Sequence, residues 1–475
     1  MTDIERTLVR TLDERRDRLA DLARAIWARP ETALQERFAS QSLAAVLSEA
    51  GFAVAWGAGG MDTAFVAEWG AGGPVIGLLG EYDALPGLSQ DARPERHELV
   101  AGGPGHGCGH NLYGVAAMAS ALALQAALRE TGRPGTVRFY GCPAEETLTG
   151  KTYMARDGVF DDLDAAVTWH PSSVNGVWAN GSSLAMYSFQ VHFRGVASHG
   201  AADPHRGRSA LDGAMLMDVG VNYLREHVIA DARIHAVITH GGQAPNVVPP
   251  KASIWYFVRA PRRDQVEAIY QRVLDCARGA ALMSGTEFDV GFLTACAELL
   301  PNETISALAL DAMDDLGGGP AFDAEELAFA AALQATVDPA QVEADLRETL
   351  DKAAAGTTRD DLGAVLCQRT IRPNAAPRIM YGSTEVGDVS QIAPTANLLA
   401  ATHPHGTPAH SWQLTASAGS AVGLRGMDFA ARAMALTAWR LIAEPETLRA
   451  ARTEFEAATG GRKYVSPLPD GARPK

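Results

Sequence analysis

The residues of this chain that most clearly could do chemistry are a cysteine and a histidine two positions apart. Cys108 and His110 lie in a glycine-rich stretch, 104–111, that runs directly into the apolar segment 112–118. A thiolate and a neutral imidazole suit zinc-like first-row cations, and glycines let the backbone bend closely around an ion. A lone Cys-x-His is a weak motif, however. Cys108 could instead be a small buried apolar residue, with His110 hydrogen-bonded at a helix start.

Other potential ligands follow three apolar runs that are typical of strands buried on both faces of a parallel sheet. These runs are 74–80, 136–142 and 165–169, and the polar residues after them are Asp83, Glu145, Glu146 and His170. In open α/β sheets, ligands bind just beyond the carboxyl ends of the strands. This shared placement strengthens the metal-site hypothesis.

Two adjacent glutamates can have two different roles in metal-assisted hydrolysis. One carboxylate can bind a cation while the other accepts a proton from the attacking water. Glu145 and Glu146 could also be surface acids, and His170 could be a hydrogen-bonded core histidine. Together with the Cys-x-His, the donors predict a hydrolase that uses a metal-activated water.

The elements that must position these residues alternate as strand, helix and strand over the first part of the chain, which predicts an α/β domain with a mostly parallel sheet. From about residue 187 the order becomes strand-helix-strand-strand-helix-strand, typical of a small α+β sandwich. We therefore place the first part of a catalytic domain at 1–185, an inserted domain at 186–298 and the second part of the catalytic domain at 299–475. One amphipathic helix is expected over 4–28, and a solvated helical insertion over about 303–360.

Composition narrows the functional class. The formal charge of −15 over 475 residues opposes binding to nucleic acid or to anionic membranes, which favours a small-molecule substrate. The five widely spaced cysteines form no disulfide framework, and we see no signal peptide and no apolar run of the ~18 residues that a membrane span needs. We expect a cytoplasmic protein.

Six ordered motifs carry a resemblance to a known family. They are 80–86 (GEYDALP), 107–111 (GCGHN), 144–146 (AEE), 198–200 (SHG), 241–250 (GGQAPNVVPP) and 409–413 (AHSWQ). The chain resembles the metal-dependent amidohydrolases of the aminoacylase/carboxypeptidase G clan. Within that clan it is most similar to the branch that contains the B subunit of p-aminobenzoyl-glutamate hydrolase.

The resemblance implies a site with two divalent metal ions, most often Mn²⁺ or Zn²⁺. The implied ligands are Cys108, His110, Glu146, His170 and His410. Glu145 would be the general base, the thiolate of Cys108 would touch both ions, and Asp83 would orient His110 through its other ring nitrogen. His403 and His405 compete with His410 for the last position; His410 matches the family's final histidine.

One departure concerns Asn111, because related auxin-conjugate hydrolases carry an aspartate there and this chain lacks that charge. The metal preference is expected to shift accordingly.

The inserted domain is implied to be a lid or dimerisation domain. In the clan its histidine and asparagine steady the tetrahedral oxyanion, and here these would be His199 and Asn246. Arg259 is a candidate to bind a substrate carboxylate, with a structural salt bridge as the alternative.

The implied function is hydrolysis of the amide bond of an N-acyl or N-aroyl amino acid, of the p-aminobenzoyl-glutamate or indoleacetyl-aspartate type. The alternatives are a dipeptidase of the same clan and a non-catalytic binding or regulatory subunit. The implied assembly is a homodimer, or a pair with a paralogous second subunit.

Overall fold

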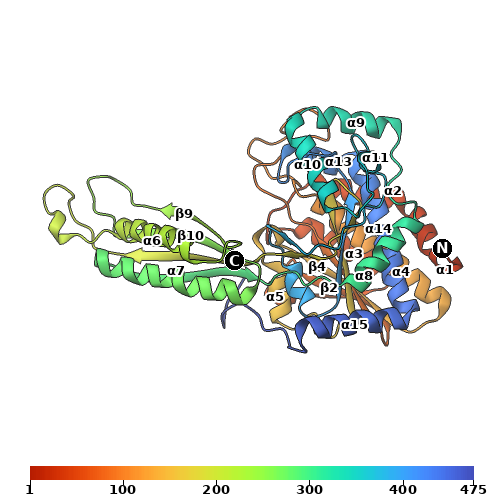
Figure 1. The fold of residues 1–475 in the computed structure, drawn as a ribbon, viewed down its shortest axis with the longest axis horizontal. Helices are drawn as coiled ribbons and strands as arrows, with labels where there is room; N and C mark the ends of the chain where they lie inside the picture. The colour runs from red at the N-terminus through yellow and green to blue at the C-terminus, as the bar shows by residue number, and fades with distance from the viewer. Residues whose placement is uncertain (475) are drawn as a thin grey trace. The chain divides into compact units, whose positions relative to one another are not determined.

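The computed structural model describes residues 1–474, which form two compact units (Figure 1). Unit 1 consists of Met1–Gly181, Leu300–Arg378 and Val389–Tyr464. Unit 2 consists of Ser182–Leu299, Ile379–Asp388 and residues 465–474. The assignment of a catalytic and a lid domain to stretches of this chain stays a prediction.

Unit 1 is built around a seven-stranded sheet. In spatial order its strands are β1 (Ala53–Trp56), β2 (Phe65–Ala71), β4 (Gly135–Cys142), β3 (Val75–Glu81), β5 (Ala165–Ser172), β13 (Thr395–Ala401) and β6 (Gly176–Val177). The central strands β4, β3, β5 and β13 pair in parallel, whereas the pairings at both edges are antiparallel. The predicted α/β fold is confirmed, but the sheet that was predicted to be mostly parallel is mixed, because three of its six strand pairings are antiparallel.

The long helix α4 (His110–Thr131) packs on β3, β4 and β5, and α14 (Ala421–Ala443) packs on α4 and on β13. By length and composition α4 could cross a bilayer, which corrects the expectation that no run is long enough. Nearly all of α4 is buried inside the protein, so its apolar residues serve as core. α4 starts at His110, so this buried helix carries one of the predicted metal ligands in its first turn.

The remaining helices of unit 1 surround this core. They are α1 (Asp3–Asp13), α2 (Arg16–Trp27), α3 (Arg37–Glu49), α5 (Gly150–Arg156), α8 (Glu303–Asp315), α9 (Ala324–Gln334), α10 (Pro339–Lys352), α11 (Arg359–Leu362), α13 (Trp412–Gly419) and α15 (Pro445–Thr459), with the 3₁₀ turns η1 (Ala58–Gly60) and η2 (Glu145–Thr147). The single helix expected over 4–28 is wrong: the chain turns at Glu14. Because of this break, α1 and α2 can both pack against α4, and their buried leucines are Leu8, Leu12 and Leu19.

Unit 2 contains a four-stranded antiparallel sheet with two helices. In spatial order the strands are β11 (Glu287–Cys296), β8 (Ala185–Arg194), β10 (Lys251–Ala260) and β9 (Arg233–His240). The helices α6 (Ala210–Leu224) and α7 (Arg263–Ser284) lie side by side and cover the sheet (Figure 1). The turns η3 (Pro204–Arg206) and η4 (Arg225–His227), the strand pair β7 (Gly181–Ser183) with β12 (Arg378–Met380), and α12 (Val386–Ser390) complete the structure.

Candidate metal centre

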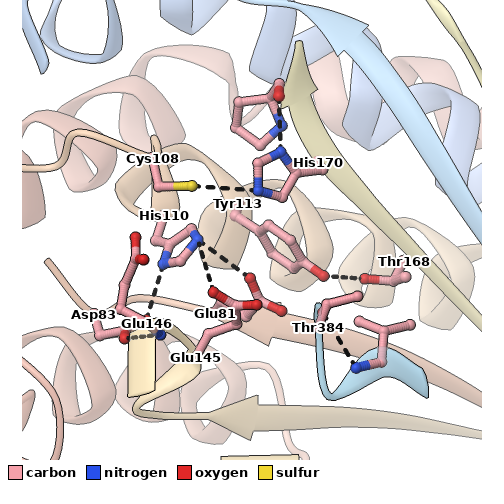
Figure 2. A network of polar contacts seen from close by, with 12 residues as sticks. Glu81, Asp83, Cys108, His110, Tyr113, Glu145, Glu146, Thr168, His170 and Thr384 are labelled. Atoms are coloured by element: carbon pink, nitrogen blue, oxygen red, sulfur yellow. Dashed lines mark hydrogen bonds and ion pairs between the residues drawn. The ribbon is translucent and has the colours of Figure 1, made fainter. Parts of the chain in front are cut away.

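The candidate ligands come from the ends of the central strands and the start of α4. β3 ends at Glu81 and leads into Asp83, while β4 leads into the 3₁₀ turn that carries Glu145 and Glu146. Cys108 comes just before Gly109, the N-cap residue of α4 (Figure 2). Parallel strands place their carboxyl ends at the same edge of the sheet, so side chains distant in sequence meet there.

Gly109 makes the turn that separates Cys108 from His110. Its φ of 76° lies in the left-handed region, and a Cβ at this position would approach Pro171 Cγ to 2.9 Å. Any other residue would be strained here and would push against the β5 end that carries His170. The glycine therefore lets the thiol and the imidazole converge.

His110 is fully buried and held by one ring nitrogen. Nδ1 donates to Asp83 Oδ1 at 2.9 Å, which leaves Nε2 facing Glu81 Oε2 at 3.4 Å and Glu145 Oε2 at 4.0 Å. Figure 2 shows the ring between Asp83 on one side and these two carboxylates on the other. A carboxylate on the far nitrogen fixes the tautomer, so Nε2 is the atom presented to a cation.

Cys108 is shared by two groups of donors. One group is Cys108, His110 and His170, and the other is Cys108, Glu146 and His410; within each, one ligand atom per residue lies within 4.8 Å of the others. The Cys108 Sγ is 3.4 Å from His170 Nε2, and Glu146 Oε2 is 3.4 Å from His410 Nε2. A side chain common to two donor groups has the placement needed to bridge two ions.

Of the three histidines near residue 405, the structure brings His410 to this cluster. His410 has a φ of 53°, and its backbone N–H bonds Gly107 O, which ties it to the loop before Cys108. His405 Nε2 instead faces Leu362 O at 3.0 Å, and His403 Nδ1 faces Thr402 Oγ1 at 3.1 Å. His403 and His405 belong to neither group.

The protonation states of the cluster are strongly perturbed. Burial raises the pKa of the Cys108 thiol to about 12 and lowers the pKa of His170 to about 4. Burial also raises the pKa of Glu146 to about 7, with Asp83 and Glu81 adding to the rise and His110 opposing it. Burial alone would lower the pKa of His110, but Cys108 and Asp83 raise it well above the ordinary value. Because ligands bind in deprotonated form, a cation that enters the cluster must displace protons.

The arrangement fits divalent cations. His110 Nε2, Glu81 Oε2 and Glu146 Oε1 are buried atoms without a hydrogen-bond partner. Buried polar atoms are normally satisfied, so unsatisfied ones that converge on one place point to a missing ligand. Two ligands on one tetrahedral ion lie about 3.4 Å apart for metal–ligand distances near 2.1 Å. The Glu81–His110 and Glu146–His410 contacts, each of 3.4 Å, are too long for good hydrogen bonds and match that separation.

Three residues near the cluster escaped the sequence analysis as site residues. Glu36 and Glu81 are buried acids, and Lys151 is a fully buried lysine whose Nζ lies 2.7 Å from Glu81 Oε1. Glu81 had a usable signal, because it is an acid at the end of an apolar strand. For Glu36 and Lys151 no local pattern marks the burial.

The predicted substrate-binding residues lie in unit 2. His199 Nδ1 accepts hydrogen bonds from the N–H groups of Ala201 and Ala202, so its proton is on Nε2, which is then a donor. Asn246 lies beside it, since Gly200 N–H bonds Asn246 O at 2.8 Å.

Arg259 is half-buried at the end of β10. Its Nη1 contacts Ser383 Oγ at 3.4 Å, and its Nε is buried without a hydrogen-bond partner. No carboxylate among residues 1–474 forms an ion pair with it, so the alternative of a structural salt bridge is not seen in the described part of the chain.

Comparisons with known proteins identify the family and the fold of this chain. The family model for peptidase family M20/M25/M40 matches residues 77–402. The chain is 41% identical over 483 aligned positions to the B subunit of p-aminobenzoyl-glutamate hydrolase from Escherichia coli, covering 100% of this chain and 99% of the relative. It is 30% identical to the Xaa-Arg dipeptidase of Mus musculus, covering 95% and 92%. A solved dinuclear metal-binding peptidase of the same family from Bacillus subtilis shares the fold, with a TM-score of 0.57 at 17% identity, covering 91% and 99%.

Proposed function

Since the chain belongs to peptidase family M20/M25/M40, we propose that it is a metal-dependent hydrolase of the amide bond of an N-acyl or N-aroyl amino acid. The observation that carries the proposal is the pair of donor groups sharing Cys108, with Glu145 beside them. The names of the relatives favour a conjugate of the p-aminobenzoyl-glutamate type. The name of the Xaa-Arg dipeptidase keeps a dipeptide as the second candidate.

In the proposed site, His110 and His170 would hold one divalent ion, Glu146 and His410 would hold the other, and Cys108 would be a ligand shared by the two donor groups. Two such ions would supply Lewis-acid polarisation and would make water acidic enough to deprotonate near neutral pH. A thiolate with three imidazoles suits zinc, and manganese remains the other candidate.

Glu145 is the proposed general base. Its Oε2 lies 4.0 Å from His110 Nε2, at the rim of the cluster, and its side chain is partly accessible, as a group that exchanges protons with water must be. It would take a proton from the attacking water as oxygen bonds to the carbonyl carbon. It would then return that proton to the amine nitrogen as the C–N bond breaks.

The proposed roles of unit 2 follow from its contacts. The donor tautomer of His199, beside Asn246, supports hydrogen bonding to the oxyanion of the tetrahedral intermediate. The guanidinium of Arg259, whose buried Nε has no hydrogen-bond partner, supports binding of the substrate carboxylate.

Unit 2 also has the features of a dimerisation domain. β9 is an edge strand, and the exposed apolar side chains Met215, Val219 and Tyr223 recur every four residues along α6. A homodimer is the proposed assembly. The name of the Escherichia coli relative, which is one of two kinds of subunit, supports a paralogous second subunit as the alternative. The cytoplasm is the proposed location, in keeping with five free cysteines.

The deciding experiment measures release of the aromatic amine from p-aminobenzoyl-glutamate by protein loaded with Mn²⁺ or Zn²⁺, and by a chelated sample. We expect metal-dependent release. Glu145→Ala should lower the rate by about 10²–10⁴-fold with both metals still bound, because general-base catalysis contributes that much. Glu95→Ala removes an exposed acid outside the donor groups and should leave the rate unchanged.

Turnover retained by Glu145→Ala would refute its role as base. If no amine is released, indoleacetyl-aspartate and a dipeptide panel including Xaa-Arg come next. Absence of bound metal, together with absence of cleavage across all of these, would favour the non-catalytic binding role.

A further inference from the structure

Glu81 is the last residue of β3 and is buried beneath the metal centre, with only 1% of its surface exposed. Its two carboxylate oxygens have different surroundings. Oε1 lies 2.7 Å from Lys151 Nζ, whereas Oε2 has no hydrogen-bond partner and faces His110 Nε2 at 3.4 Å. An acid whose only task was to pair with lysine inside the core would be expected to have both oxygens satisfied.

The atom that Glu81 faces is the one that His110 presents to a cation, because His110 Nδ1 is occupied by Asp83. Glu81, His110 and Glu145 form a third group of donors within 4.8 Å of one another (Figure 2). The 3.4 Å separation between Glu81 Oε2 and His110 Nε2 is that of neighbouring ligands on one tetrahedral ion with bonds of about 2.1 Å.

Lys151 comes from α5, which follows the turn carrying Glu145 and Glu146. Its side chain is fully buried. A buried charge is tolerated when a partner offsets it, so Lys151 stabilises an ionised Glu81 in the interior. The pair is neutral as a whole, which means that it brings a carboxylate to the metal centre without adding net charge.

We propose that Glu81 is a further carboxylate of the metal centre on the His110 side, and that Lys151 positions it by binding its other oxygen. The inference rests on the proposed metal site and adds two residues that the predicted ligand set lacks. Glu81 would complete the coordination of the ion held by His110. Lys151 would act through Glu81 and would not touch the ion.

Glu81→Gln tests the carboxylate with little change in shape. The ammonium of Lys151 can only donate, so the amide oxygen would turn to Lys151 and the NH₂ group would face the His110 side, where it cannot bind a cation. The dissociation constant of one of the two ions, measured with Co²⁺ and Zn²⁺ by chelator competition, should rise by about 10–100-fold. The visible absorption of the Co²⁺ form should change as well, because it reports ligand number and geometry.

Glu326→Gln is the matched control. Glu326 is also a buried acid, 5% exposed, and is paired with Arg425, with Oε1 2.8 Å from Nη2, but it belongs to none of the donor groups. We expect this variant to keep the metal affinities and cobalt spectrum of the unaltered chain.

Lys151→Met tests the positioning residue by thermal unfolding with and without metal. Loss of the ammonium leaves the Glu81 charge uncompensated, so a cation beside it should stabilise the variant more than the unaltered chain, and the metal-induced rise in Tm should be larger. An unchanged rise would overturn the proposal. Metal affinities and a cobalt spectrum that are unaltered in Glu81→Gln would also overturn it. Glu81→Gln therefore tests the proposal even if Lys151→Met does not fold.

The outcomes also separate this inference from the proposed function. If the unaltered chain binds no divalent ion, the metal site itself fails. If the unaltered chain binds two ions and Glu81→Gln binds both equally well, only the role of Glu81 and Lys151 fails.

Discussion

Asp83 connects the two donor groups of the candidate metal centre. Its Oδ1 accepts from His110 Nδ1, and its Oδ2 accepts from the backbone N–H of Glu146, each at 2.9 Å. Burial alone would raise the pKa of Asp83, but the hydrogen bond from His110 lowers it below the ordinary value. Asp83 therefore stays ionised and holds one ligand of each group.

Asp83→Asn should weaken metal binding although its shape is nearly unchanged. Asparagine has one acceptor oxygen, so its NH₂ group must face either His110 or the Glu146 N–H, and one of the two contacts is lost. We expect the affinity for at least one ion to fall by about 10–100-fold in chelator competition. Asp164→Asn, whose carboxylate bonds the Val75 N–H, is the control and should bind metal normally. Equal affinities for both ions in Asp83→Asn would contradict this role.

For single residues, the sequence predicted which residue types form the candidate site better than it predicted which side chains are buried. The paired acids and His170 follow predicted strands, Cys108 and His110 lie where a loop enters α4, and the structure brings these side chains together. Lys151 could not be recognised, because a single lysine has no local pattern that distinguishes a buried ion pair from a solvated side chain. The family resemblance favours His410 over His403 and His405, and in the structure His410 faces Glu146 while the other two contact Thr402 and Leu362.

The turn after β4 is the element that sets the positions of Glu145 and Glu146. Ala144 and Leu148, which flank it, have φ values of 58° and 53°, a conformation that costs energy for residues with a Cβ. The turn is held at Ala144, whose N–H bonds Glu36 Oε1 at 2.9 Å. Glu36 precedes α3, so a residue over a hundred positions away holds the turn that carries Glu145 and Glu146.

Glu36→Gln should change how stability depends on pH. Burial, followed by the nearby Asp83, raises the pKa of Glu36 to about 7 from an ordinary value of 4.5. Between these values the folded chain holds a proton that the unfolded chain has lost, so this group's contribution to stability falls as pH rises from about 4.5 to 7. Glutamine is neutral throughout. Its oxygen can accept from Leu34 and Ala144 while its NH₂ donates to Thr63 Oγ1.

The measurement is the free energy of unfolding of the chelated protein in urea at pH 5 and pH 8. We expect the free energy of unfolding of Glu36→Gln, taken relative to that of the unaltered chain, to be higher at pH 8 than at pH 5 by up to about 3 kcal/mol. Glu31→Gln provides the control for losing a nearby acid, because the Glu31 carboxylate accepts hydrogen bonds from the α3 N–H groups of Phe38 and Ala39. If the free energies of unfolding of Glu36→Gln and the unaltered chain differ by the same amount at both pH values, the raised pKa of Glu36 is ruled out.

At the level of elements, most strands and helices follow from local pattern, since apolar runs and 3.6-residue periodicity are properties of short segments. The break at Glu14 did not follow, because it depends on how α1 and α2 pack against α4. The antiparallel edges of the main sheet and the pairing of β7 with β12 likewise depend on contacts between distant segments. Such contacts leave no signal in the local sequence.

The described part of the chain consists of two compact units. The candidate metal centre lies entirely in unit 1. Unit 2 has exposed apolar side chains on α6 and an unpaired edge at β9, where Val237 and Ile238 are also exposed. A long exposed edge strand beside apolar side chains favours pairing with a second chain, and a two-fold axis would pair it with itself.

Replacing Val219 and Tyr223 together by Glu should convert a dimer to a monomer, because the dimer would bury two charges per chain without partners. Sedimentation equilibrium at micromolar concentration measures the mass, and metal content is measured on the same samples. If His199 and Asn246 act in the partner's site, turnover should fall together with the dimer while both ions stay bound. Leu282→Glu changes an exposed apolar residue on α7 instead and should leave a dimer. A variant that stays dimeric would exclude this face of α6, and an unaltered chain that is monomeric by itself would favour a paralogous partner.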